Sequence, residues 1–145
     1  METPETNCTG TQSEIGKPWF AVVAVADLMF VAKITSAAKQ ANCQMKLLQN
    51  PEALVSAVRE VPDGCAPLVI VDLNHLTLQP IEFIRRLRSS PDIAGVPVLG
   101  YLSHTQVELK REAEQAGCNL VLPRSVFSQN INDILRRQSC HLDSL

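Results

Sequence analysis

The sequence has few aromatic residues, no excess of positive charge and no long apolar run. Aromatic residues make up 4% of the 145 residues, so we expect an aliphatic core. Thirteen basic residues against fifteen acidic ones give a net charge of −2, which argues against broad nucleic-acid binding because that needs a basic face. The longest apolar stretch, Trp19 to Ala26, is far too short to cross a bilayer. The sequence therefore predicts a globular protein with neither a nucleic-acid nor a membrane partner.

The cysteines are scattered, odd in number and form no C-x-x-C pair: Cys8, Cys43, Cys65, Cys118 and Cys140. A disulfide framework or a structural zinc site would show paired spacing. We therefore expect free thiols, with Cys43 and Cys118 used as small apolar residues. The N-terminus is polar and lacks the positive charge and hydrophobic core of a secretory signal, which predicts a cytoplasmic location.

Short apolar runs alternate with amphipathic stretches along the chain. The predicted strands cover residues 19–25, 44–49, 68–72, 96–102 and 120–122. The predicted helices cover residues 28–42, a stretch opened by Asn50-Pro51, another after Gln79-Pro80, residues 104–116, and a last helix capped by Ser128. Five alternating pairs predict an α/β protein with the flavodoxin-like, doubly wound (βα)5 fold, whose five-stranded parallel sheet has the order 2-1-3-4-5. We expect one domain over residues 18–138, with tails at 1–17 and 139–145.

Polar residues follow the predicted strands at the sheet edge where such folds bind ligands. Asp27 follows the first strand, Asp72 ends the third, and Arg124 follows the fifth. Two neighbouring carboxylates, with a backbone carbonyl near Asn74, suit Mg²⁺, and an arginine can grip a phosphoryl group. The spacing alone leaves an inert interpretation open, because aspartates at strand ends also cap helices and turns.

Three segments carry a resemblance to a known family: Leu68-Val-Ile-Val-Asp72-Leu-Asn74, Val96-Pro-Val-Leu99 and Ala116-Gly-Cys-Asn-Leu-Val-Leu122. Together with the strand and helix order over residues 18–138, they resemble the receiver domain of bacterial two-component response regulators. The resemblance implies that Asp72 accepts a phosphoryl group from a histidine kinase or phosphotransfer protein. It also implies that Asp27, Asp72 and the carbonyl of Asn74 hold Mg²⁺, and that Arg124 and Ser103 contact the phosphoryl group.

The chain departs from the pattern of that family at several positions. Ala26 replaces the first residue of the acidic pair, and Arg124 replaces a lysine that a proline normally follows; here Pro123 precedes it. Leu102 stands where the family has a hydroxyl residue, with Ser103 one position later, and Val121 replaces an aromatic switch residue. The usual route from phosphorylation to an altered surface has thus lost both of its named parts.

Three functions remain open at this stage. The first is a stand-alone signalling module, not an enzyme, that is phosphorylated on Asp72 and acts through protein contacts. The second is a pseudo-receiver that binds its partner independently of phosphate. A Mg²⁺-dependent phosphate-ester hydrolase is less favoured, because Asn74 stands where a second acid/base carboxylate would be needed and no glycine-rich loop follows the first strand. The resemblance places partner or homodimer contacts on the fourth helix, fifth strand and fifth helix.

Other conspicuous residues have simpler interpretations. His75 and His104 are expected to be solvated loop histidines, since neither has a second ligand at metal spacing. Arg85, Arg86 and Arg88 are expected on the solvated face of the third helix.

Overall fold

The computed structural model describes residues 17–75, 77–103 and 106–136, and all structural statements refer to these. The predicted tails lie outside the described residues except for Lys17, and so does His104. The predicted limits of the domain stay a prediction. No helix in the described ranges is long and apolar enough to span a membrane.

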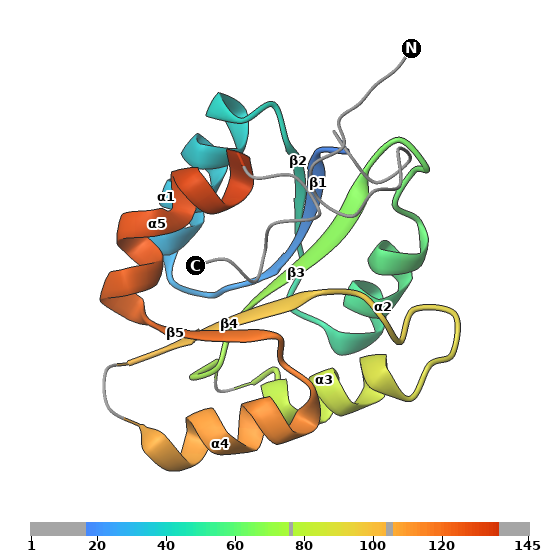
Figure 1. The fold of residues 1–145 in the computed structure, drawn as a ribbon, viewed down its shortest axis with the longest axis vertical. Helices are drawn as coiled ribbons and strands as arrows, with labels where there is room; N and C mark the ends of the chain where they lie inside the picture. The colour runs from blue at the N-terminus through green and yellow to red at the C-terminus, as the bar shows by residue number, and fades with distance from the viewer. Residues whose placement is uncertain (1–16, 76, 104–105, 137–145) are drawn as a thin grey trace, which may run out of the picture.

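Five parallel strands form one sheet in the order β2-β1-β3-β4-β5, which confirms the predicted flavodoxin-like fold (Figure 1). The strands are β1 (Trp19–Ala24), β2 (Gln44–Leu47), β3 (Ala66–Asp72), β4 (Val98–Leu102) and β5 (Leu120–Pro123). Asp72 lies beside Tyr101, and Leu102 lies beside Pro123. The carboxyl ends of β1, β3, β4 and β5 therefore meet at one edge of the sheet.

Helices cover both faces of the sheet (Figure 1). One face carries α1 (Leu28–Gln40) and α5 (Arg124–Arg136), which pack against each other; the other carries α2 (Pro51–Arg59), α3 (Pro80–Arg88) and α4 (Val107–Ala116). The predicted start of α2 is confirmed, since the Asn50 side chain accepts hydrogen bonds from the N–H groups of Glu52 and Ala53 at 2.8 and 3.2 Å. Gly117, with φ of +116°, ends α4 in a conformation that favours glycine.

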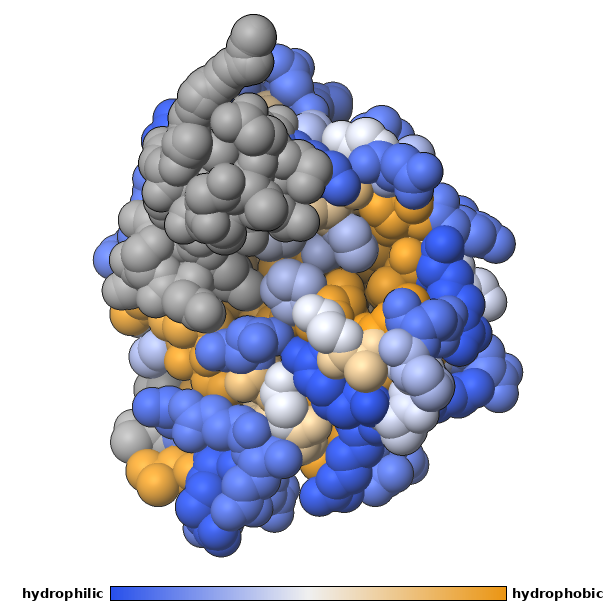
Figure 2. Space-filling view, turned by 45° about the vertical axis from the view of Figure 1, so that its right-hand side comes forward, coloured by the Kyte–Doolittle hydropathy of each residue, from blue (hydrophilic) through white to orange (hydrophobic). Residues whose placement is uncertain are grey.

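The two helical layers enclose two cores. The core under α2, α3 and α4 is mainly aliphatic, as predicted, and includes Cys118. The core under α1 and α5 gathers aromatic side chains: Trp19, Phe30, Tyr101 and Phe127. Outside the grey part of Figure 2, hydrophilic residues surround hydrophobic residues that show in the middle of this face.

Several predicted boundaries and side-chain positions differ from the structure. α5 begins at Arg124, directly after β5, and Ser128 lies inside the helix, where its Oγ accepts a hydrogen bond from Lys33 Nζ at 2.8 Å. The prediction of a cap at Ser128 was therefore wrong. β2 ends at Leu47, and β4 begins only at Val98.

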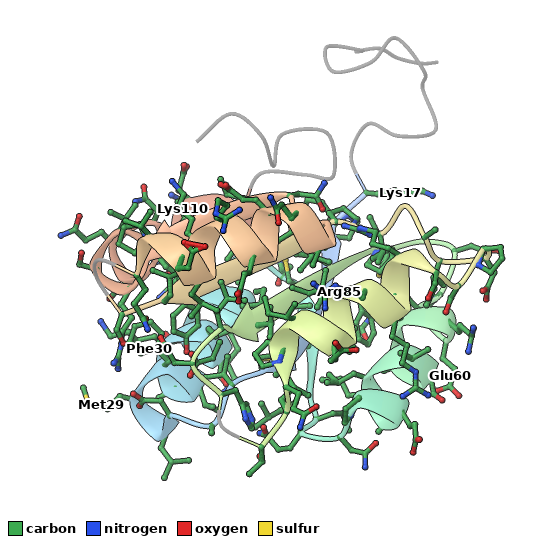
Figure 3. The ribbon with its side chains drawn as sticks, turned by 90° about the horizontal axis from the view of Figure 1, so that it is seen from below. Lys17, Met29, Phe30, Glu60, Arg85 and Lys110 are labelled. Atoms are coloured by element: carbon green, nitrogen blue, oxygen red, sulfur yellow. The ribbon has the colours of Figure 1, made fainter. Side chains whose placement is uncertain are left out.

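Arg88 is not on the solvated face that was predicted for it. Its guanidinium donates to the carbonyls of Gly117, Ala94 and Val96 at 2.6–3.1 Å and to Asn119 Oδ1 at 2.8 Å. It thereby fastens the end of α3 to the segments that flank β4 and β5. Arg85, three residues earlier, is exposed as predicted (Figure 3).

Candidate functional site

Asp72 is half-buried at the carboxyl end of β3. Its Oδ1 accepts a hydrogen bond from the Asn74 N–H at 2.8 Å, which orients the carboxylate. Burial raises the pKa of Asp72, and the negative charge of Asp27 raises it further. The Asn74 N–H, His75 and Arg124 act in the opposite direction and lower this pKa. The carboxylate of Asp72 therefore lies within electrostatic range of both Asp27 and Arg124.

Asp27 precedes α1 and caps it. Its Oδ1 accepts a hydrogen bond from the Met29 N–H at 2.9 Å, so this aspartate caps the helix. Its Oδ2 accepts a hydrogen bond from Arg124 Nη2 at 2.7 Å, and the two side chains are 35% and 45% exposed. The structure thus brings Arg124 to the acidic edge but pairs it with Asp27, a contact that the sequence analysis did not anticipate.

Asn74 and Ser103 form a link between two loops. Asn74 Oδ1 accepts hydrogen bonds from the Ser103 N–H at 2.8 Å and from Ser103 Oγ at 3.2 Å. Asn74 Nδ2 donates to Gln106 Oε1 at 2.9 Å. The loop after β3 is therefore fastened to the loop after β4, and the Ser103 hydroxyl faces Asn74.

Leu102 and Val121 are both buried in the core under α2, α3 and α4. They line a shallow hollow of about 220 Å³ together with Val107, Lys110 and Pro123. Aliphatic packing therefore occupies the two positions where the receiver family has a hydroxyl and an aromatic residue.

An aromatic stack lies under the site on the face of α1 and α5. The ring centroid of Tyr101 is 4.8 Å from that of Phe30 and 4.8 Å from that of Phe127. The Arg124 guanidinium lies over the Phe30 ring, 5.0 Å from its centroid. The Tyr101 hydroxyl is buried without a hydrogen-bond partner, and burial, with the charge of Asp72, raises its pKa.

Sequence reasoning missed this stack because its three rings come from β4, α1 and α5. The one local signal is that Phe30 follows Asp27 by three residues, which places it on the first turn of a helix capped by that aspartate. Figure 3 shows the neighbouring Met29 reaching away from the molecule, and its side chain is 70% exposed.

His75 is buried, with 6% exposure, so the prediction of a solvated histidine was wrong. Its Nε2 lies 2.6 Å from Gln49 Oε1, and Gln49 Nε2 donates to the carbonyl of Val25 at 3.0 Å. The turn after β3, closed by a hydrogen bond from the His75 N–H to the Asp72 carbonyl at 3.0 Å, directs the ring inward. His75 therefore connects the loops that follow β1, β2 and β3.

Within the described ranges, no group of three or more His, Cys, Asp or Glu residues could hold a metal ion.

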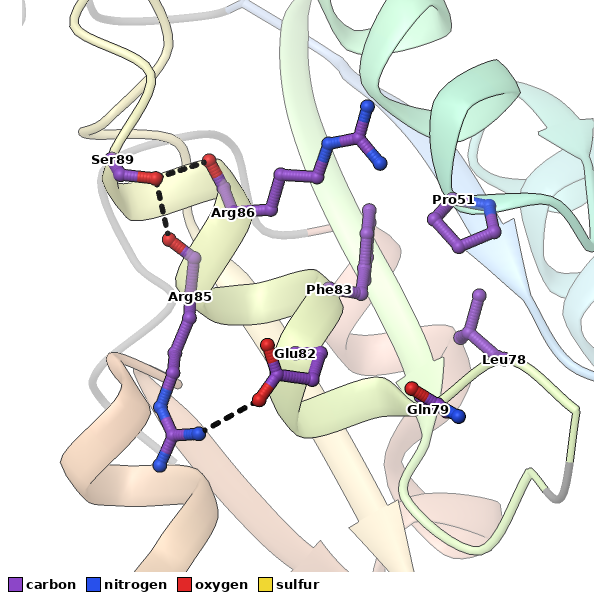
Figure 4. Close-up of a pocket in the computed structure, with 8 residues that line it drawn as sticks. All are labelled: Pro51, Leu78, Gln79, Glu82, Phe83, Arg85, Arg86 and Ser89. Carbon is purple, nitrogen blue, oxygen red and sulfur yellow. Dashed lines mark hydrogen bonds and ion pairs between the residues drawn. The ribbon is translucent and has the colours of Figure 1, made fainter.

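A separate recess of about 500 Å³ lies between α2 and α3 and includes Phe83, Arg85 and Arg86 (Figure 4). Its arginines are paired: Arg85 with Glu82 at 3.1 Å and Arg86 with Glu52 at 3.8 Å. This recess has no part in the acidic edge.

The sequence matches no family model, and the curated proteins contain no significant match to it. Solved structures do match. The chemotaxis response regulator CheY4 of Vibrio cholerae is 15% identical, with a TM-score of 0.67 over 83% of this chain and 98% of CheY4. A putative response regulator from Chloroflexus aurantiacus is 18% identical, with a TM-score of 0.68 over 83% of this chain and 100% of that protein.

A third similar structure is the Mn²⁺-bound form of response regulator Rcp1. It is 12% identical, with a TM-score of 0.63 over 81% of this chain and 91% of Rcp1. At these identities the likeness establishes the fold: the chain has the fold of response-regulator receiver domains over most of its length.

Proposed function

We propose that the chain is a receiver-type signalling module in which Asp72 accepts a phosphoryl group from a histidine kinase or a phosphotransfer protein. The observation that carries this proposal is the position of Asp72, half-buried at the carboxyl end of β3, at the same edge as Asp27 and Arg124. A carboxylate oxygen of Asp72 attacks the phosphorus of a phosphohistidine. The P–N bond breaks and an acyl phosphate forms. The electron pair of that bond stays on the ring nitrogen, and the imidazole leaves as a neutral group because its other nitrogen already carries a proton.

In this proposal Mg²⁺ is held by Asp27, Asp72 and the backbone carbonyl of Asn74, and it supplies positive charge to the transferring phosphoryl group. The oxygen donors suit the ion, and the fold neighbour Rcp1 binds Mn²⁺. Asp27 can serve as a ligand only after its Oδ2 is released from Arg124. The same release leaves Arg124 with a charge that a phosphoryl group on Asp72 can pair with.

The partner surface proposed here consists of α4, β5 and α5. The exposed side of α4 carries both signs of charge, namely Glu108, Lys110, Arg111, Glu112 and Glu114, with Glu108 and Arg111 paired. Val107, 69% exposed, adds an apolar contact beside the hollow at Leu102 and Val121. Such a mixed surface suits a reversible, salt-sensitive contact with another protein or a second copy of the chain.

A second candidate is a pseudo-receiver that uses the same surface regardless of phosphorylation. The buried aliphatic side chains of Leu102 and Val121 favour it, because neither can hydrogen-bond to a phosphoryl group or rotate as an aromatic switch does. The two candidates differ in one property, the modification of Asp72.

The test is phosphorylation of the full chain by acetyl phosphate with Mg²⁺, read by intact mass and by phosphate-affinity gels. The wild type and Asp63→Asn, a control in an exposed turn, should each gain one phosphoryl group, and Asp72→Asn should gain none. An unmodified wild type, or equal modification of Asp72→Asn, contradicts the proposal.

The hydrolase alternative requires turnover of a generic phosphate ester that Asp72→Asn abolishes.

A further inference from the structure

Both oxygens of the Asp27 carboxylate are already engaged. Oδ1 caps α1 through the Met29 N–H at 2.9 Å, and Oδ2 accepts from Arg124 at 2.7 Å. The preceding residue, Ala26, has no side-chain oxygen to offer in its place. Among the described residues, the only other carboxylate at this edge is that of Asp72. Its Oδ1 accepts a hydrogen bond from the Asn74 N–H at 2.8 Å.

The Arg124 guanidinium is held on two sides. One nitrogen bonds to Asp27, and the plane of the group lies over the Phe30 ring, 5.0 Å from its centroid. Phe30 is itself fixed by stacking on Tyr101 at 4.8 Å. The side chain of Arg124 therefore already supplies a positive charge to Asp27, at the edge of the sheet where Asp72 also lies.

This arrangement decides how a divalent cation can bind. Mg²⁺ requires near-octahedral oxygen ligands at close range and loses its hydration water reluctantly, so it binds best to carboxylate oxygens that no other cation holds. The guanidinium of Arg124 is bound to Asp27 Oδ2 and repels a second positive charge. Binding of Mg²⁺ to Asp27 together with Asp72 therefore competes with the ion pair between Arg124 and Asp27.

We propose that Arg124 competes with Mg²⁺ for Asp27, so that Mg²⁺ binds at this site only when the ion pair between Arg124 and Asp27 breaks. This inference rests on the proposed function, whose site it regulates. In the protein without Mg²⁺, the guanidinium of Arg124 takes the place of the metal ion beside Asp27.

Release of Arg124 has a structural consequence, because this arginine is the first residue of α5 and Asp27 is the cap of α1. Two further side-chain hydrogen bonds join these helices. They run from Lys33 Nζ to Ser128 Oγ at 2.8 Å and from Asn132 Nδ2 to Gln40 Oε1 at 3.0 Å. Loss of the ion pair between Arg124 and Asp27 frees the N-terminal end of α5, which belongs to the proposed partner surface.

The test compares Mg²⁺ affinity of the full chain with that of Arg124→Met and of Arg85→Met, by calorimetry and by Mn²⁺ competition. Arg85→Met is the matched control, since it removes the same charge from an exposed position on α3. Arg124→Met should bind Mg²⁺ about tenfold more tightly than the wild type, because it removes both the ion pair and a nearby like charge. Arg85→Met should bind like the wild type.

A second readout follows the arginine itself. In the wild type, Mg²⁺ should shift the NMR signal of the Arg124 side-chain Nε–Hε group, and in Asp27→Asn that shift should be lost. Equal affinities of Arg124→Met and Arg85→Met, or an Nε–Hε signal that stays in place while Mg²⁺ binds, would overturn the competition. Tighter binding by Arg124→Met together with failed phosphorylation of Asp72 would keep the competition and reject the phosphoryl acceptor.

Discussion

The two faces of the sheet carry different kinds of side chain next to the acidic edge. On the face of α1 and α5, Asp72 lies beside Tyr101, whose ring stacks on Phe30 under the Arg124 guanidinium. On the opposite face, Leu102 and Val121 pack among aliphatic side chains beside a shallow hollow. If Asp72 is phosphorylated, as proposed, the change of charge would therefore act first on the face that carries Arg124, α1 and α5.

The same two faces also differ in how they treat buried polar groups. Arg88, on the face of α3 and α4, donates to backbone carbonyls in the segments that precede β4 and β5. In the core under α1 and α5, by contrast, Trp19 Nε1 and Tyr101 Oη are buried and have no hydrogen-bond partner among the described residues. The Arg88 side chain thus has several hydrogen-bond partners, whereas the polar atoms of Trp19 and Tyr101 lie in a core that contains the aromatic stack.

The largest expected effect comes from breaking the ring stack. Phe127→Ala should lower the free energy of unfolding by about 3–5 kcal/mol, because it empties a fully buried ring position. Denaturant unfolding measures the loss. Val126→Ala, at a partly exposed neighbour, should cost no more than about 1 kcal/mol. Similar costs for both variants would show that the stack does not support this face.

The hydrogen-bonded face is tested by Arg88→Met. This variant keeps an unbranched side chain but leaves the carbonyls of Gly117, Ala94 and Val96 without their donor. We expect the free energy of unfolding to fall by about 2–4 kcal/mol. Arg85→Met, on the exposed side of the same helix, should stay within about 0.5 kcal/mol of the wild type. A cost for Arg85→Met as large as that for Arg88→Met would contradict the role of the Arg88 hydrogen bonds.

Tyr101→Phe tests the unpartnered hydroxyl. Because this oxygen is buried without a hydrogen bond, its removal should stabilise the protein by about 1 kcal/mol while the stack stays intact. Thermal unfolding measures the gain. A loss of stability instead would mean that the hydroxyl has a partner in solution, and the contrast between the two faces would weaken.

The smallest effect is the pH dependence of Asp72→Asn. Burial raises the pKa of Asp72 above its ordinary value of 3.8, so the folded protein binds the proton more tightly than the unfolded chain. The resulting loss in the free energy of unfolding is absent below the unfolded pKa. It grows as the pH rises from that value through the folded pKa and is complete at neutral pH. Asp72→Asn should therefore stabilise by about 0.5 kcal/mol at pH 7, since a half-exposed charge is screened, and the gain should vanish near pH 3.5. A gain that is equal at both pH values would contradict this cause.

The fold could be predicted from the sequence because the buried strands and amphipathic helices have clear local patterns. The meeting of Asp27, Asp72 and Arg124 at one edge followed from the rule that parallel strands align their carboxyl ends. Which carboxylate Arg124 pairs with depends on the side-chain direction at the first residue of α5, and its sequence spacing does not show this. The start of α5 was missed because Arg124 and Ser125 lack any apolar periodicity.

The positions of Arg88 and His75 could not be predicted for a related reason. Both are polar residues drawn inward by partners distant in sequence, Gly117 for Arg88 and Gln49 for His75. Sequence periodicity describes where apolar residues go, but it does not identify the hydrogen bonds that allow a polar group to be buried.

Under the proposed function, the charged edge acts through Arg124 and α5 rather than through Leu102 and Val121. This route can be followed in a two-dimensional amide NMR titration of the full chain with Mg²⁺, then with beryllofluoride as a phosphoryl mimic, with Asp72→Asn as the control. We expect shifts at Asp27, Asp72 and Asn74 that spread along α1 and α5 and leave the amides of Leu102 and Val121 nearly unchanged. Shifts concentrated at Leu102, Val121 and α4, or no response to beryllofluoride, would contradict it.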